Sequence, residues 1–297
     1  MKTITVFTPT YNRAYCLHQC YESLLKQSNK DFIWLIVDDG SSDNTKELVE
    51  SWIDDHLIDI NYHYQENQGM HGAHNSAYDL ISTELNVCID SDDFMPETAI
   101  DDILQFWKSS DKSNSVAGII GLDAYKSGEI IGQKNPEQIH KTTLEDLHHK
   151  YHISGDKKLV YRTEIVKKFK PYYPIFKEER FVPLGTLYLR IDKNYTLLTL
   201  NKVLCIVEYM EDGSSRNIYK QYFRHPRGFQ YARIATMKHS KYLKVRFKNA
   251  IHYISHSLQL RDRAFLKKTP NLFLTLLAIP FGIILYSYLF YQNNMKK

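Results

Sequence analysis

The 297-residue sequence has few cysteines and lacks the glycine-rich signatures of several nucleotide-binding enzymes. Its four cysteines form no Cys-x-x-Cys pair, which disfavours a disulfide framework and predicts reduced thiols in a cytosolic protein. No Gly-x-Gly-x-x-Gly motif follows the first apolar run, and no Gly-Lys-Ser/Thr loop is present. These absences argue against a dinucleotide-dependent oxidoreductase and against a Walker-type ATPase.

The sequence also lacks an apolar leader, a linker between its halves, an internal repeat and a low-complexity tract. The opening stretch MKTITVFTPTYNR has no long apolar run behind Lys2, so we expect neither a cleaved signal peptide nor export. Hydrophobic residues make up 43% of the chain, which excludes a disordered protein. The length fits one large domain or two ordinary ones.

Charge is distributed unevenly along the chain, although the formal net charge is only +4. Up to residue 219 there are 33 acidic and 23 basic residues, whereas residues 220–268 contain 13 basic residues and one acidic residue. This division predicts an acidic body and a basic surface for an anionic partner. A membrane surface fits better than nucleic acid, because the basic segment adjoins an apolar stretch and no nucleic-acid-binding module is recognisable.

Residues 272–290, LFLTLLAIPFGIILYSYLF, form an uncharged run that is about 28 Å long as a helix, close to the thickness of a bilayer's hydrocarbon core. Lys267 and Lys268 precede the run, which favours membrane contact. Pro280 and Gly282 predict a kink near its middle. Spanning, re-entrant and in-plane arrangements therefore stay open, and the alternative is a buried core helix.

Apolar runs alternate with helical patterns in the first half of the chain. Strands are expected at 3–8, 32–37, 58–64 and 85–89, with the third helix ending near Leu80. Near-continuous apolar strands separated by helices predict an α/β fold, with a parallel sheet covered by helices on both faces.

The second half of the chain has a more mixed pattern. It contains an apolar run, VAGIIGL, and a strand candidate, KLVYRT, and two strands are expected around YTLLTL and VLCIVEY. After Asn217 the sequence predicts basic helices whose Tyr, Phe and Ile positions are spaced for one apolar face. That face either lies on a membrane surface or packs back on the body.

Polar clusters follow each of the first four strands: PTYNR, DDGSSD, ENQG and DSDD. In an open α/β sheet the carboxyl ends of the strands form the ligand crevice, so we expect these clusters to gather there. Asp90, Asp92 and Asp93 would repel one another in a solvated turn, and a cation would relieve that repulsion. Two or three carboxylates at a strand end suit Mg²⁺ or Mn²⁺ shared with substrate phosphates.

The chain resembles the family 2 glycosyltransferases of the GT-A fold, specifically those of bacterial polysaccharide, capsule and lipopolysaccharide synthesis. The resemblance lies in TVFTPTYNRA, IVDDGSSDNT, ENQGMHGAHNSA and CIDSDDFMP, in that order. It continues through GDKKLVYRTEI, PIFKEERFVPLGTLYLRID and VEYMEDGSSRN, and so covers about residues 3–217.

The resemblance implies a Rossmann-like, mixed and mostly parallel sheet flanked by helices. The expected glycosyltransferase domain is 1–217, with a nucleotide-binding half at 1–98 and an acceptor-binding half at 99–217. Residues 218–297 would form a basic helical region whose apolar segment attaches the protein to the cytoplasmic face of a membrane. The implied activity is inverting, metal-dependent transfer of a sugar, with UDP as the expected nucleotide, to a glycan or lipid-linked acceptor.

The resemblance also assigns roles to residues of the donor site. Asp39 would accept a hydrogen bond from the base, and Asp90 and Asp92 would form an Asp-x-Asp motif that holds Mn²⁺ or Mg²⁺, with Asp93 as a helper. The residues expected to bind the nucleotide sugar are Pro9, Thr10, Tyr11, Asp39, Gly69, Asn75, Asp90 and Ser91.

Glu179 resembles the catalytic base of the family, which takes the proton of the acceptor hydroxyl. Relatives often have glycine before this base, whereas Glu178 precedes it here, so Glu178 is the alternative. Met70 stands where relatives often carry lysine, which removes the expectation of a phosphate-contacting lysine there. The competing hypothesis is a catalytically silent relative that binds a nucleotide or glycan as a membrane assembly partner. A nucleotidyltransferase is disfavoured, because PTYNRA is not a basic glycine-rich loop.

Overall fold

The computed structural model describes residues 2–110, 112–208 and 218–295, and the chain divides into two compact units. The sheet unit comprises Met1–Pro171 and Asn194–Met210, and the helical unit comprises Tyr172–Lys193 and Glu211–Lys297. These units differ from the expected division at residue 217, because Tyr172–Lys193 clusters with the basic helices. The part of VEYMEDGSSRN beyond residue 208 lies outside the described residues.

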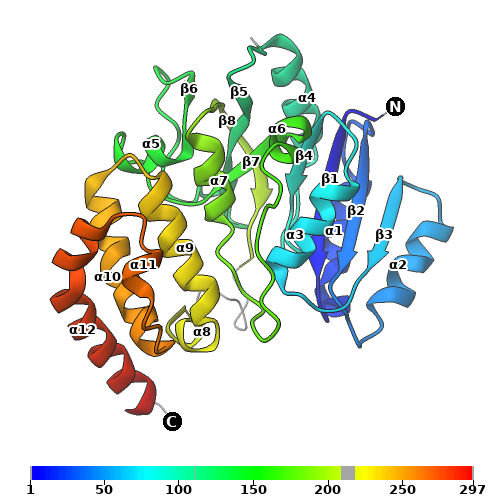
Figure 1. The fold of residues 1–297 in the computed structure, drawn as a ribbon. Coiled ribbons are helices and arrows are strands. Elements are labelled where there is room, and N and C mark those ends of the chain that lie inside the picture. Colours follow the sequence, from blue (N-terminus) through cyan, green and yellow to red (C-terminus); the bar gives the residue numbers. More distant parts are fainter. Residues whose placement is uncertain (1, 111, 209–217, 296–297) are drawn as a thin grey trace. The chain divides into compact units, whose positions relative to one another are not determined.

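Among the described residues, eight strands form one mixed sheet in the order β3-β2-β1-β4-β7-β5-β8-β6 (Figure 1). Strand β1 pairs in parallel with β2 and β4, β2 with β3, and β5 with β8. Strand β7 is antiparallel to β4 and β5, and β6 to β8. The α/β fold and the parallel order of the first four strands are confirmed. The strands are β1 Ile4–Thr10, β2 Phe32–Asp38, β3 Ile60–Tyr64, β4 Leu85–Cys88, β5 Val116–Ala124, β6 Lys141–Thr142, β7 Lys157–Arg162 and β8 Thr196–Ile206.

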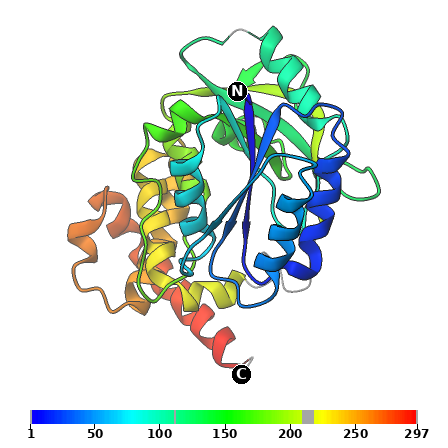
Figure 2. The ribbon, with the colours of Figure 1, turned by 90° about the vertical axis from the view of Figure 1, so that its right-hand side faces the viewer.

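Helices cover both faces of the sheet. Successive strand residues point to opposite faces, so the apolar side chains of β1 pack against helices on both sides. Val6 of β1 belongs to the same buried cluster as Trp52 of α2. Phe7 points the other way and meets the His74 ring of α3 edge-on, with the ring centroids 5.2 Å apart. Figure 2 shows α1 and α3 on opposite sides of the strands. The helices of this unit are α1 Ala14–Leu25, α2 Thr45–Asp54, α3 Met70–Leu80, α4 Ala99–Ser109, α5 Leu144–His149 and α6 Thr163–Lys167.

One strand, β8, replaces the two strands expected in YTLLTL and VLCIVEY. The chain runs through Asn201 and Lys202 without a turn. The pairing of β8 with β5 is irregular there and shows register shifts, one of them between Ile120 and Leu122. Asn201 also accepts the Asn135 N–H at 2.9 Å and donates to the Asn135 carbonyl at 2.8 Å. The expectation of two strands is wrong because this side chain anchors a loop alongside a continuous strand.

The helical unit contains the expected basic helices. Helix α10 packs on α12 through a cluster that includes Tyr253, Ile254, Leu274 and Ala278. Gly282 permits this close approach, because a Cβ atom there would lie 2.4 Å from the Cβ of Ile254. Among the described residues its helices are α7 Gly185–Asp192, α8 Ile218–Arg224, α9 Pro226–His239, α10 Leu243–Gln259, α11 Phe265–Lys268 and α12 Leu272–Met295.

Candidate functional site

Hydrogen bonds tie the last residue of β1 to the polar segments that follow β2 and β3. The Asp39 N–H donates to the Thr10 carbonyl at 2.8 Å. The buried Asp39 carboxylate accepts the N–H groups of Gln68 and Gly69 at 2.9 and 2.7 Å. Three predicted site residues, Thr10, Asp39 and Gly69, are therefore brought together at the carboxyl edge of the sheet.

Gly69 and Asn75 belong to the segment that begins α3. Gly69 precedes the helix with φ +83°, a left-handed conformation that favours glycine. Asn75 lies in the second turn and is half-buried. Met70, at the first helical position, is 40% exposed. A flexible apolar side chain thus stands at a helix start, where a lysine would add positive charge.

The end of β1 presents a buried hydroxyl beside an exposed ring. Pro9 and Thr10 are buried, whereas Tyr11 is 49% exposed. The Thr10 Oγ1 atom is buried and has no hydrogen-bond partner among the residues that the structure describes. Because a buried hydroxyl is normally hydrogen-bonded, this atom has an unmet hydrogen-bonding capacity at the predicted donor site.

The acidic stretch after β4 divides its carboxylates between solvent and interior. Asp90 and Asp92 are half-buried, and Ser91 and Asp93 are buried. The Asp93 carboxylate accepts the Glu208 N–H at 3.1 Å, which ties the stretch to the segment after β8. Burial raises the pKa of Asp93 to about 7, with Lys158 opposing the shift. Asp93 therefore points into the protein, and Asp90 and Asp92 are the pair nearer to solvent.

The half-buried Lys158 of β7 supplies a positive charge close to this stretch. Its Nζ atom donates to the Cys88 carbonyl at 3.4 Å. Burial alone would lower the pKa of Lys158, but the negative side chains around it, including Asp123, Asp93 and Asp90, raise it well above its usual value. Lys158 therefore stays charged and offsets the repulsion among the aspartates from inside the protein.

Sequence reasoning missed Lys158. In KKLVYR, lysines 157 and 158 are neighbours in a strand, so one of them must face each side. The alternation does not tell which side is covered. The only signal was that Lys158 shares a face with Val160, which is fully buried.

Glu179, in the helical unit, is bound to the start of a helix. Its Oε1 atom accepts the Arg227 N–H at 3.0 Å, and its Oε2 atom accepts the Gly228 N–H at 2.8 Å. Both donors lie in the first turn of α9, where backbone N–H groups lack helical partners and the helix dipole favours negative charge. The carboxylate, 4% exposed, thus holds the loop 178–181 on α9.

Glu178 differs sharply from its neighbour. Its side chain is 80% exposed, and its nearest ionic partner is the Arg227 guanidinium at 3.9 Å. The two glutamates offered as alternatives for the base therefore have different environments, one fixed by two backbone donors and one open to solvent. Their roles in catalysis stay predictions.

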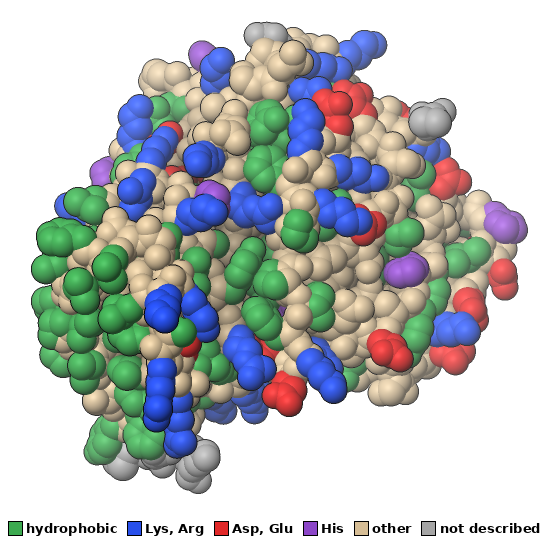
Figure 3. Space-filling view, viewed as in Figure 1, with side chains coloured by type: hydrophobic (Ala, Val, Ile, Leu, Met, Phe, Trp, Pro, Cys, Tyr) green, Lys and Arg blue, Asp and Glu red, His purple; other side chains and the backbone are tan. Residues whose placement is uncertain are grey.

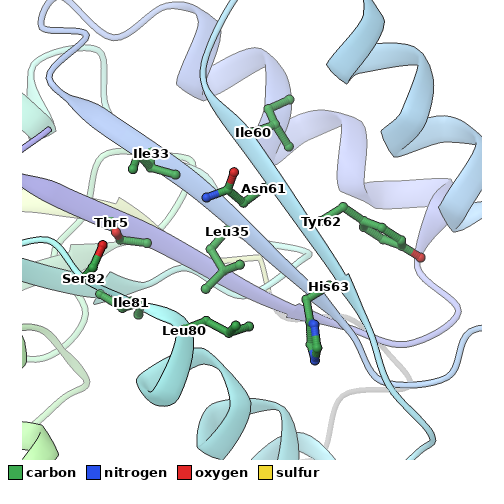
Figure 4. A pocket seen from close by; sticks show the side chains of 10 residues that line it. All are labelled: Thr5, Ile33, Leu35, Ile60, Asn61, Tyr62, His63, Leu80, Ile81 and Ser82. Carbon is green, nitrogen blue, oxygen red and sulfur yellow. The ribbon is translucent and has the colours of Figure 1, made fainter. Parts of the chain in front are cut away.

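A pocket of about 350 Å³ lies elsewhere on the sheet unit (Figure 4). It is lined by residues such as Leu35 of β2, His63 of β3 and Leu80 at the end of α3. None of the predicted site residues lines it. Its lining residues include Thr5, Ile33 and Leu35, which lie within β1 and β2 and not at their carboxyl ends.

No three His, Cys, Asp or Glu side chains within 2–110, 112–208 and 218–295 gather as a metal-ion cluster. If a metal ion binds at Asp90 and Asp92, these residues supply two carboxylates and the other ligands must come from elsewhere. That number suits Mg²⁺ or Mn²⁺ if phosphate oxygens and water supply the other ligands.

Comparisons with known proteins relate the chain to glycosyltransferases. The family model for glycosyl transferase family 2 matches residues 5–169, more than half of the chain. The GalNAc(5)-diNAcBac-PP-undecaprenol beta-1,3-glucosyltransferase of Campylobacter jejuni is 26% identical over 230 residues, which cover 75% of this chain and 71% of that protein. An uncharacterized glycosyltransferase of Nostoc sp. is 26% identical over 176 residues, 58% of this chain and 54% of that protein, so the match spans about half of that relative.

Solved structures share the fold at low sequence identity. Staphylococcus aureus TarS 1-349, in complex with UDP-GlcNAc, superposes with a TM-score of 0.60 and 20% identity, and the match covers 90% of this chain and 76% of that one. The mannosyltransferase PcManGT of Pyrobaculum calidifontis, in complex with GDP-Man and Mn²⁺, gives a TM-score of 0.56 and 16% identity, covering 98% and 83%.

Proposed function

The chain belongs to glycosyl transferase family 2, and from this premise we propose that it transfers a sugar from a UDP-sugar to a hydroxyl of a surface glycan acceptor, with inversion at the anomeric carbon. The observation that carries the proposal is the set of hydrogen bonds joining Thr10, Asp39 and Gly69 at the end of β1, whose parallel neighbour β4 leads into Asp90 and Asp92. This assembly is polar, lies where ligands of α/β sheets bind, and includes a buried hydroxyl that has no partner in the part of the chain that the structure describes.

The proposed donor site uses residues at the ends of β1, β2 and β4. Pro9 and Tyr11 would line the nucleotide pocket, and Asp39 would accept a hydrogen bond from the base. Supporting this, Asp39 is fixed by two backbone donors, so its carboxylate would meet a ligand without reorganising. Asn75 and Ser91 would complete the donor contacts.

Asp90 and Asp92 would hold Mn²⁺ or Mg²⁺ against the diphosphate. The pair fits such an ion, because both side chains reach partial exposure while Asp93 turns toward the interior. A bound divalent cation would neutralise charge on the departing diphosphate. Lys158 would support this stretch before the cation binds, because its positive charge opposes the rise in the pKa of Asp93.

Glu179 is the proposed base, and Glu178 is its alternative. The base would take the proton of the acceptor hydroxyl while that oxygen bonds to the anomeric carbon and the bond to the diphosphate oxygen breaks. The pair of backbone donors on Glu179 supports a fixed orientation for the carboxylate. Each of its oxygens keeps a further lone pair for a proton.

The proposed acceptor is a glycan, with a lipid-linked one favoured, and the proposed location is the cytoplasmic face of a membrane, reached through the segment 272–290. Two observations support this location: α12 is long and apolar enough to contact a bilayer, and exposed lysines accompany it. The name of the Campylobacter jejuni relative specifies an undecaprenol-linked substrate for that protein.

A second candidate function is a silent assembly partner that binds a nucleotide or glycan. The observation that favours it is the same Glu179 geometry, because a carboxylate at the first turn of α9 has a sufficient structural role without catalysis. Under this alternative, changing Glu179 would alter the stability of the helical unit and leave no transfer activity to lose.

The test is a panel of UDP-sugars with Mn²⁺ or Mg²⁺, in which sugar transfer or hydrolysis is measured for wild type, Glu179→Gln and Glu178→Gln. We expect Glu179→Gln to lower kcat by about 10²- to 10⁴-fold and Glu178→Gln to change it only a few-fold. The two variants remove the same charge from adjacent residues, so Glu178→Gln is the matched control. The reverse result assigns the base to Glu178, and wild type with neither activity supports the silent partner.

A further inference from the structure

Helix α12 has one docked half and one exposed half. Leu274, Ala278 and Gly282 face α10, and at about 100° per residue they fall in one half of the helical wheel. Figure 3 shows hydrophobic side chains gathered over α12. The exposed large apolar residues of α12, of which all except Phe281 and Tyr288 fall in the opposite half, are Leu272, Phe273, Leu276, Leu277, Phe281, Ile283, Ile284, Tyr288, Phe290 and Tyr291.

This exposed half contains no charged residue and is too large for an ordinary protein surface. Contiguous apolar patches of this extent mark a partner protein or a membrane. Two tyrosines, Tyr288 and Tyr291, are 55% and 59% exposed near the end of the helix. Tyrosine is enriched at the level of lipid headgroups, where its ring is buried and its hydroxyl hydrated.

Basic side chains flank the apolar half, and their charge favours an anionic membrane over a second copy of the chain as the partner. Lys244 and Lys248 of α10 are exposed and lie one turn apart, about a quarter of the wheel away from the stripe that contacts α12. Lys267 and Lys268 of α11 are exposed just before α12 begins. A second copy of the chain would bring these like charges together, whereas an anionic lipid surface complements them.

The docked half distinguishes an in-plane helix from a spanning one. The Phe247 ring of α10 lies 5.9 Å from the Phe281 ring, and Phe281 is near the middle of α12. A spanning α12 would place this contact near the bilayer midplane, and it would carry Arg246 and Lys248 there with it. Charged side chains are costly at that depth, so crossing requires α12 to leave α10.

Resting on the membrane attachment proposed above, we propose that α12 lies in the plane of an anionic membrane, with its exposed half in the lipid and its other half docked on α10. This arrangement keeps the α10–α12 core intact, and it leaves Lys244 and Lys248 at headgroup level. The hydrophobic thickness of a bilayer is then irrelevant to the length of α12.

Vesicle flotation tests the surface. Purified full chain is mixed with vesicles of phosphatidylcholine alone or with about a third phosphatidylglycerol, and the anionic vesicles should bind at least about tenfold more tightly. Leu277→Lys/Ile284→Lys should weaken that binding by about tenfold or more, because two apolar contacts are replaced by charge. The matched control is Leu57→Lys/Leu80→Lys on the sheet unit, which adds the same charge at 62% and 49% exposure, against 50% and 67%.

Cysteine labelling tests the orientation. Pro270→Cys and Gln292→Cys place thiols at the two ends of α12, and a membrane-impermeant maleimide is added outside sealed vesicles to which the protein was bound. An in-plane helix exposes both thiols to the outside. The unsubstituted chain gives the background, because Cys16, Cys20 and Cys205 are buried and Cys88 is half-buried.

The labelling experiment tests the orientation of α12, and the flotation experiment tests whether its exposed half binds a membrane. Labelling of one end alone means that α12 crosses the bilayer and overturns the in-plane proposal while membrane attachment stands. No flotation, or equal weakening by both lysine pairs, overturns the membrane surface itself. Neither readout measures sugar transfer, so failure here is distinct from failure of the proposed enzymatic function.

Discussion

The sheet unit and the helical unit bury positive charge in opposite environments. In the sheet unit Lys158 lies among aspartates. In the helical unit the guanidinium of Arg233 lies 5.7 Å from the centroid of the Tyr222 ring, and its hydrogen bonds go to the Tyr222 hydroxyl and to Asn249. One buried cation thus has anionic partners, and the other has rings and neutral oxygens.

The two environments of positive charge fit the proposed roles of the two units, cation and donor binding in one and membrane contact in the other. Under the proposed function the aspartates of the sheet unit would receive a cation with the donor, and Lys158 supplies a positive charge among them beforehand. The helical unit shows its positive charge on the surface, where Lys244 and Lys248 are exposed, and keeps its buried histidines neutral. The charges of the sheet unit thus lie in the proposed donor site, whereas those of the helical unit lie on its surface.

Lys158→Met should have the largest effect on stability, because it removes the positive charge that the aspartates of the sheet unit surround. It leaves Asp93 and Asp123 buried without their counter-ion, so we expect the free energy of unfolding to fall by about 3–5 kcal/mol at neutral pH. Urea unfolding followed by tryptophan fluorescence measures this unit selectively, because the three tryptophans, Trp34, Trp52 and Trp107, all belong to it.

The control is Lys134→Met, which removes an exposed lysine from the same unit and should change the stability by less than about 0.5 kcal/mol. A loss below about 1 kcal/mol for Lys158→Met would show that the aspartates do not depend on Lys158.

Acid should weaken the helical unit through His252 and His256. Burial, then Arg233 and Lys248, lowers the pKa of His252 to about 4. Burial, then Arg233 and His252, lowers the pKa of His256 to about 3. Below the unfolded value of 6.5 the unfolded chain binds protons that the folded unit does not, so stability falls as the pH falls. The loss at pH 5 should be about 2 kcal/mol for each histidine.

Far-UV circular dichroism measures this effect in urea titrations between about pH 7 and about pH 5. His252→Gln/His256→Gln should remove about 4 kcal/mol of the pH dependence, whatever its effect on stability at neutral pH. An unchanged dependence in the double variant would mean that the two histidines accept protons freely in the folded unit.

The sequence located the first four strands of the sheet unit, although β1 continues through Pro9 to Thr10, two residues past its expected end. Apolar runs located β1 to β4, and the polar residues after them identified Thr10, Asp39 and Asp90 as neighbours along one edge. It did not predict which carboxylate turns inward, because the direction of Asp93 is set by the Glu208 N–H, a partner 115 residues further along the chain. Long-range partners of this kind leave no local pattern.

The helical unit was less predictable for a different reason. Helix α12 is apolar on every side, so its composition gives no sign of which half docks on α10. The docked half is defined by Gly282 and Ala278, which allow close approach, and by the partners that α10 supplies. Glu179 illustrates the same limit, because its contact with the first turn of α9 joins residues nearly fifty positions apart.

Calorimetric titration of the full chain with UDP, with and without Mn²⁺, tests the central claim most directly. We predict binding that depends on Mn²⁺ and weakens by about tenfold or more in Asp92→Asn, while the neighbouring Asp93→Asn, whose side chain faces the interior, stays within a few-fold of wild type. Absence of UDP binding, or binding that neither Mn²⁺ nor Asp92→Asn changes, would contradict the account of the strand ends as a metal-assisted donor site.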